Sequence, residues 1–177
     1  MALKRENDLM AGALDAAARE ICLAARTAPK TRGVDLIETA VVDGEDLKKI
    51  VSEMEKIFAS TQREAFRKNA GSLNDCVCAV LIGAKNKTAG LAPCGLCGFR
   101  DCDDNEKNGA VCAFNMMDLG IAVGSAISVA ADKRIDNRLM WTVGMAAKNL
   151  GLLGQGVKQI IGIPLSATGK NIFFDKK

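Results

Sequence analysis

The chain has 177 residues, of which 49% are hydrophobic and 25% charged, and it contains seven cysteines but neither histidine nor tyrosine. Without histidine, the chain can form no Ser–His–Asp or Cys–His catalytic set and no histidine-ligated zinc, haem or Rieske site. The net charge of +3 comes from 24 basic and 21 acidic residues scattered along the chain. This balance is too mild and too dispersed for a nucleic-acid-binding surface.

A chain of this length is typical of one domain, and we expect residues 1–177 to form a single α+β domain. The first residues turn polar at once, so they predict no secretory signal. The most apolar stretch, residues 110–131, includes Asn115 and Asp118 and many small residues, which favours a buried core helix over a membrane span. We therefore expect a cytoplasmic protein with no membrane partner and with reduced cysteines.

The first half of the chain predicts alternating helices and strands. Residues 5–26 carry apolar and alanine side chains at helical spacing, and Pro29 and Gly33 end this helix in a basic loop. Residues 36–42 predict a strand, and Asp43 can cap a following helix that runs to about Asn69.

In the second half, residues 76–82 form a short apolar run that is typical of a buried strand. The cysteine-rich loop that follows, residues 83–112, far exceeds the usual length of about four to six residues, so something other than an apolar core must order it. We then expect a buried helix to Ala131 and a helix from about Asp136 to Asn149, closed by Gly151. Short strands are predicted at 160–165 and 172–174, and the order of elements indicates an α+β fold with helices on a mixed sheet.

The cysteines of the long loop have the spacing of metal ligands. The four candidate ligands are Cys94, Cys97, Cys102 and Cys112. The first three follow a C-x2-C-x4-C pattern, and glycines after Cys94 and Cys97 let the backbone approach closely and donate N–H groups to cluster sulfides. Because histidine is absent, a site of four thiolates is the only soft-metal site that this chain can form.

Three interpretations of these cysteines stay open. A 4Fe–4S cluster fits the spacing, the glycines and the absence of histidine. A zinc ion held by four thiolates would stabilise an interaction module, although such sites usually pair two CxxC segments and only one is present. The third interpretation is small buried side chains or a thiol redox pair, which suits Cys22 within its predicted helix. Cys76 and Cys78 alternate along a predicted strand, so they would share one face and could replace Cys112 as fourth ligand.

The segment Ala92-Pro-Cys-Gly-Leu-Cys-Gly-Phe-Arg-Asp-Cys resembles the CGxCGxxxC signature of ferredoxin-type 4Fe–4S domains in redox proteins of anaerobes. In those domains the fourth cysteine lies further downstream than Cys112 does here. Taken whole, the chain resembles a family of uncharacterised bacterial and archaeal proteins described as containing a ferredoxin domain. The resemblance implies an iron–sulfur protein for electron transfer or redox sensing, with a redox protein as partner.

The flanks of the loop resemble a shortened flavin-dependent nitroreductase. The resemblance rests on the helix that ends in the basic loop, on the strand and helix after it, on Met117-Asp-Leu-Gly-Ile-Ala-Val-Gly-Ser-Ala as the central helix, and on residues 150–164. It implies a mixed sheet with helices, a homodimer, and FMN bound at the dimer interface. A second hypothesis follows, in which the chain is a flavin-dependent oxidoreductase with the cluster as electron relay.

The Arg-Ser-x-Arg element that holds the FMN phosphate in nitroreductases has no counterpart in this sequence. Other basic side chains could bind the phosphate, because phosphate groups bind guanidinium forks and backbone N–H groups. The candidates are Arg26, Lys30, Arg32 and Lys170. The alternative is a solvated basic cluster at a helix end, which the helix dipole favours.

Overall fold

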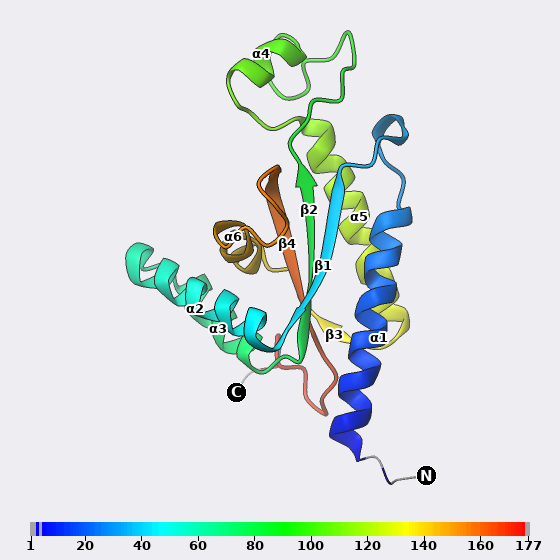
Figure 1. Cartoon of the computed structure of the whole chain (residues 1–177), viewed down its shortest axis with the longest axis vertical. Helices are drawn as coiled ribbons and strands as arrows, with labels where there is room; N and C mark the ends of the chain where they lie inside the picture. Colours follow the sequence, from blue (N-terminus) through cyan, green and yellow to red (C-terminus); the bar gives the residue numbers. More distant parts are fainter. Residues whose placement is uncertain (1–2, 4, 176–177) are drawn as a thin grey trace.

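The computed structural model describes residue 3 and residues 5–175, which form helices on both faces of a central sheet (Figure 1). In chain order the elements are α1 (Glu6–Thr27), the 3₁₀ turn η1 (Thr31–Gly33), β1 (Ile37–Asp43), α2 (Gly44–Thr61), α3 (Glu64–Asn74), β2 (Cys78–Lys85), α4 (Cys102–Lys107), α5 (Ala113–Asp132), β3 (Asp136–Asn137), α6 (Trp141–Asn149) and β4 (Val157–Ser166). The predicted α+β class is confirmed, as are the helices that correspond to α1 and α5 and the strands that correspond to β1, β2 and β4.

The sheet has the strand order β1–β2–β4–β3, and each neighbouring pair is antiparallel where a mixed sheet is predicted. The reason lies between β1 and β2, where α2 leads the chain away and α3 leads it back. As a result β2 begins beside the end of β1, with Asp43 opposite Cys78. A single crossover helix would instead have carried the chain to the other end of β1 and produced a parallel neighbour.

The sequence predicts one helix from Asp43 to about Asn69, but the structure divides this segment in two. Gln62 adopts a left-handed conformation with φ of 55°, and its N–H donates to the carbonyl of Phe58 at 2.8 Å, which ends α2. The second helix, α3, then continues to Asn74. Glycine or asparagine usually occupies such a left-handed position, so the glutamine gave no signal of a helix end.

The predicted helix from 136 to 149 begins later than expected. Residues 136–137 pair with the end of β4, and Met140 forms hydrogen bonds of 2.8 and 3.1 Å in both directions with Gly162. This pairing holds the segment extended as far as Met140, so α6 starts at Trp141. The expected Gly151 helix end is present, with φ of 68°.

The predicted strand at 172–174 is wrong. Asn171 accepts hydrogen bonds on Oδ1 from the amides of Phe173 and Phe174, at 3.0 and 3.2 Å. Because an asparagine side chain that bonds to the backbone two and three residues ahead stabilises a turn, the short apolar run does not extend.

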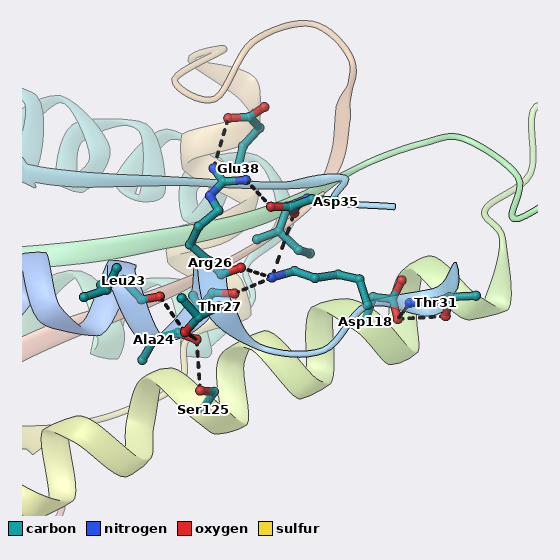
Figure 2. Close-up of polar contacts among 12 residues, drawn as sticks. Leu23, Ala24, Arg26, Thr27, Thr31, Asp35, Glu38, Asp118 and Ser125 are labelled. Carbon is teal, nitrogen blue, oxygen red and sulfur yellow. Dashed lines mark hydrogen bonds and ion pairs between the residues drawn. The ribbon is translucent and has the colours of Figure 1, made fainter. Parts of the chain in front are cut away.

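Helices α1 and α5 cover one face of the sheet, whereas α2, α3 and α6 cover the other (Figure 1). Helices α1 and α5 pack against each other, and Ser125 on α5 donates a 2.9 Å hydrogen bond to the carbonyl of Ala24 on α1 (Figure 2). Among the described helices, α5 is the one long and apolar enough to cross a membrane, a property that core helices of soluble proteins share.

The cysteine-rich loop projects from one end of the sheet, beyond the end of β2 and next to the beginning of α5 (Figure 1). It contains the short helix α4. Only Asn105 and Cys112 are buried between Asn86 and Cys112, so this part of the chain has almost no apolar core of its own.

Candidate metal centre

The four candidate ligands of the loop line one small pocket, which we call the cysteine pocket. They are Cys94, Cys97, Cys102 and Cys112. Cys94 is exposed, Cys97 and Cys102 are half-buried, and Cys112 is buried, with 6% of its surface exposed. The space open to the centre of a water molecule is about 10 Å³, roughly enough for one water. The structure thus brings four thiols from a turn, a helix start and a segment before α5 to one place.

The first two cysteines are presented by a turn that depends on glycine. Gly95 and Gly98 have φ values of 86° and 84°, and the N–H of Gly98 donates to the carbonyl of Gly95 at 2.9 Å. Residues with a Cβ rarely adopt this region of φ, so a side chain at either position would strain the turn. The glycines predicted to allow close backbone approach are therefore needed for the turn itself.

Cys102 is the first residue of α4, and Asp101 fixes the beginning of this helix. One carboxylate oxygen of Asp101 accepts the N–H of Asp104 at 2.8 Å, and the other accepts Nε of Arg100 at 2.9 Å. The backbone hydrogen bond from Asp104 and the bond from Arg100 hold the pKa of Asp101 below its ordinary value. The capping carboxylate thus stays ionised and fixes the start of the helix at which Cys102 lies.

Cys112 is the N-cap residue of α5, and Asn105 connects it to α4. Asn105 is 1% exposed, its Nδ2 donates to the carbonyl of Val111 at 3.3 Å, and its own carbonyl accepts the N–H of Ala110 at 3.1 Å. Its Oδ1 is buried with no hydrogen-bond partner and the residue lines the cysteine pocket. Asn105 gave no signal in the sequence, because an asparagine in an acidic segment resembles a solvated loop residue.

The chemistry of the pocket suits a soft, thiolate-bound group. Its remaining walls include the apolar side chains of Leu91, Ala113 and Phe114. Within residues 3 and 5–175, no three cysteine, aspartate or glutamate side chains form a group that could hold a single metal ion. The four thiols therefore surround a common space without converging on one point.

Cys76 and Cys78, the two alternatives for the fourth ligand, lie elsewhere, and the prediction that they share one face is wrong. Cys76 precedes β2 and packs with α2, α3 and α6, whereas Cys78 packs with α1 and α5 on the opposite face. Cys78 begins β2 while the loop follows its last residue, and a strand of this length spans about 25 Å. Burial raises the pKa of Cys76 to about 12 and that of Cys78 to about 11, so both remain protonated thiols.

The basic residues predicted to bind a phosphate are engaged within the fold. Arg26 donates to Asp35 at 2.7 Å and lies 4.0 Å from Glu38 (Figure 2). The hydrogen bond with Asp35 raises the pKa of Arg26 above its ordinary value. The side chain of Lys30 is 5% exposed and donates to the carbonyls of Ala25, at 2.9 Å, and of Arg26. Both side chains thus bind groups of this chain, at the end of α1 and in the segment that connects α1 to β1.

Arg32 and Lys170 do not form one site with Arg26 and Lys30. Arg32 donates from Nη1 to the carbonyls of Ala89 and Gly90, at 3.0 and 3.3 Å, beside the cysteine-rich loop. Lys170 follows the end of β4 that pairs with Cys78, at the opposite end of the sheet. Within one chain the four predicted residues therefore do not share one site, because spacing along the chain says nothing about which end of a sheet a loop reaches.

Solved structures confirm that the fold is that of the nitroreductases. A nitroreductase family protein from Clostridium novyi NT superposes with a TM-score of 0.60 at 14% identity, over 94% of this chain and 76% of that chain. A nitroreductase with bound FMN from Desulfitobacterium hafniense DCB-2 gives a TM-score of 0.61 at 16% identity, over 88% of this chain and 79% of that chain. At such identities the likeness shows the fold alone.

Sequence relatives identify the family. Residues 108–176 match the family described as "Uncharacterized protein containing a ferredoxin domain (DUF2148)", a range that includes Cys112 but not the other three candidate ligands. An uncharacterised protein from Archaeoglobus fulgidus is 40% identical over 183 residues, covering 98% of this chain and 97% of that protein. The chain belongs to this family of proteins with a ferredoxin domain, and both resemblances inferred from the sequence are confirmed.

Proposed function

We propose that this protein is an iron–sulfur redox protein that holds a 4Fe–4S cluster and serves in electron transfer or redox sensing. Its ligands would be Cys94, Cys97, Cys102 and Cys112. The observation that carries the proposal is that these four cysteines line one pocket in a chain without histidine. The ferredoxin domain in the description of the family supports a redox role.

The arrangement of the thiols favours a cluster over a zinc ion. A tetrahedral zinc site with Zn–S bonds of about 2.3 Å requires its sulfur atoms to lie within ~4 Å of one another. In a cluster each cysteine binds its own iron, so the thiolates stand further apart around a shared volume. Among the described residues the four cysteines line one pocket and no three of them form a single-ion group, which supports a cluster over a zinc ion.

The chain around the pocket is suited to electron exchange. A bound cluster supplies one-electron chemistry, and its potential depends on hydrogen bonds to sulfur and on solvent access. The pocket is lined on one side by the buried Cys112 and by the half-buried Ala113 and Phe114, whereas Cys94 is exposed. The neighbouring Leu96 is 67% exposed, which provides an apolar contact for a redox partner protein.

Anaerobic purification followed by iron and sulfide analysis tests the proposal. We expect about four irons and four sulfides per chain, together with an EPR signal after reduction. Cys97→Ala should abolish both, while the matched change Cys22→Ala, in the half-buried part of α1, should leave both intact. A colourless protein that contains one zinc ion and loses only its folded loop in the Cys97 variant would instead establish a zinc-stabilised interaction module.

A flavin-dependent oxidoreductase is the second candidate function, because a solved structure with this fold contains bound FMN. The cluster would then relay electrons to the flavin. Since the predicted basic residues do not converge on one phosphate, FMN would need other contacts. To test this function, FMN is added to the purified protein, and the flavin absorbance at about 450 nm that stays with the protein is measured after gel filtration. Loss of all flavin on gel filtration would exclude it.

We further infer a cytoplasmic homodimer that contacts its partner through the outer face of α5. Met117 and Ile121 on this face are 44% and 45% exposed, and the exposed Gly120 and Gly124 nearby on α5 add no charge. An exposed apolar stripe of this kind is typical of an interface. Light scattering should give a dimer mass that Ile121→Lys reduces to a monomer mass. Leu23→Lys, a matched change at an exposed leucine of α1, should leave the dimer intact.

A further inference from the structure

A second cavity lies beside the cysteine pocket and shares two of its lining residues, Thr88 and Ala89. Its volume is about 330 Å³, within the range of small-molecule sites. Its walls come from η1 and the residues after it, from the loop after β2, and from the first turns of α5. We call it the η1–α5 cavity.

One wall of this cavity carries a buried carboxylate. Asp118 is 5% exposed within the apolar helix α5. Its Oδ1 accepts hydrogen bonds from the backbone N–H and the hydroxyl of Thr31, at 3.0 and 2.9 Å (Figure 2). Within the described part of the chain, Oδ2 accepts no hydrogen bond and Asp118 forms no ion pair. A buried charge is costly unless it is paired, so this oxygen is available to a donor that enters the cavity.

Asn115 lies one turn before Asp118 on α5 and lines the same cavity. It is 3% exposed, and its Nδ2 donates to the carbonyl of Lys85 at 2.9 Å. This bond fixes the orientation of the amide, so that its oxygen is the atom left to accept a hydrogen bond. Two buried side chains therefore offer acceptor oxygens to one cavity, three residues apart on one side of the helix.

The other walls carry positive charge. Arg32 and Lys87 line the cavity, and neither forms an ion pair with a carboxylate among the described residues. Arg32 has φ of 57°, a left-handed conformation that costs energy for a residue with a Cβ. Its hydrogen bonds to the carbonyls of Ala89 and Gly90 hold it in this place. Residues of both charges, with no ion-pair partner among the described residues, thus line one small space.

We propose that the η1–α5 cavity binds a small zwitterion of the α-amino acid type. Its protonated amine would lie at Asp118 and Asn115, and its carboxylate at Arg32 and Lys87. A purely cationic ligand would leave the two basic side chains unpaired, and a purely anionic ligand would leave Asp118 unpaired. The site goes beyond the redox function, since none of its binding groups is a cluster ligand, but the shared wall at Thr88 and Ala89 places its ligand next to the cysteine pocket.

Calorimetric titration of the purified protein with each of the common L-α-amino acids tests this site. We expect at least one to bind, and its amine-only and acid-only analogues to bind at least about 10-fold more weakly, since each lacks one charge-assisted contact. Measurements on protein with and without iron distinguish the two proposals, because the cavity should bind its ligand even if no cluster is found. Absence of binding by every amino acid, or equal binding of the analogues, would overturn the inference.

Three variants separate ligand binding from a purely structural role of Asp118. Asp118→Asn keeps an acceptor for Thr31 but removes the charge, and should weaken binding about 10- to 100-fold. Thr31→Val removes the hydroxyl that anchors η1 and should retain binding within a few-fold, whereas an anchoring role alone predicts that the two variants behave alike. Lys87→Gln, at an exposed position where folding is not at risk, should also weaken binding. Asp35→Asn, outside the cavity, is the control and should bind as the original chain does.

Discussion

The two ends of β2 show what surroundings do to the same residue type. At its beginning, Cys76 and Cys78 are packed in the apolar core, and burial raises the pKa of each thiol. Beyond its last residue, Lys85, four cysteines line a pocket in a loop whose buried residues are only Asn105 and Cys112. The core cysteines are small apolar side chains, while the loop cysteines have no core to join, which is why we propose that a bound group orders their segment.

The largest expected effect comes from removing the group that the loop is proposed to bind. Cys97→Ala, or chelation of the metal, should increase hydrogen exchange by at least about 100-fold in residues 86–112, because the loop has too little buried apolar area to stay closed alone. Exchange in β2 and β4 should stay unchanged. Equal protection of the loop with and without metal would show that the loop is ordered by its own contacts and would remove the contrast between the two ends of β2.

Within the core, we expect the largest loss of stability from a substitution at the closest contact between a helix and a strand. A Cβ on Gly144 would lie 1.8 Å from the carbonyl oxygen of Ile160, so α6 touches β4 at this residue. Gly144→Ala should lower the free energy of unfolding by about 3 kcal/mol, since overpacking forces the helix away from the strand. Urea denaturation measures the loss, and metal content should not change. As a comparison in the loop, Gly98→Ala meets no atom within 4 Å and should cost only about 1 kcal/mol, from its positive φ.

Thiol reactivity should separate the two groups of cysteines directly. In metal-free protein at pH 8, iodoacetamide should modify Cys76 and Cys78 roughly 100-fold more slowly than Cys94, because burial keeps their pKa values well above that of a free thiol, about 8.5. Because the pKa values of both thiols are higher in the folded chain, the same thiols ionise at lower pH in the unfolded chain. Stability should therefore be complete below about pH 8.5 and fall as the pH rises toward the folded-state values. Rapid labelling of Cys78 in the native state would contradict its place in the core.

The smallest effect is expected from the ion pair at the end of α1. Burial acts to raise the pKa of Asp35, but hydrogen bonds from Arg26 and from the Ile37 amide, together with nearby positive charges, hold it below its ordinary value. Its contribution should be present above pH ~4 and be lost as the pH falls through the folded-state pKa. Asp35→Asn should cost no more than about 1 kcal/mol, since the pair is partly exposed. Acid titration of both proteins, followed by circular dichroism, gives the difference.

Much of the candidate site followed from the sequence because its chemistry is local. The spacing of Cys94, Cys97 and Cys102 and the glycines between them fall within one short segment, where the identity of each residue limits what the backbone can do. Asn115 and Asp118 also gave a signal, as polar side chains in an apolar helix, but this signal served only as an argument against a membrane span. Their place in a cavity wall depends on Thr31 and Arg32. These two residues are distant in sequence and line the same cavity only because η1 packs on α5.

By itself the sequence determined the α+β class, the principal helices and strands and the thiolate chemistry, since these depend on periodicity, composition and short spacings. Only the tertiary structure decided which groups meet. The left-handed Gln62 breaks the long helix into an outgoing and a returning one, which makes the sheet antiparallel and puts Cys78 at the end of β2 opposite the loop. The same topology separates Lys170 from Arg26, Lys30 and Arg32 and brings Asp118 beside the cysteine pocket. Such placements arise from contacts between distant segments, and no local pattern of side chains records them.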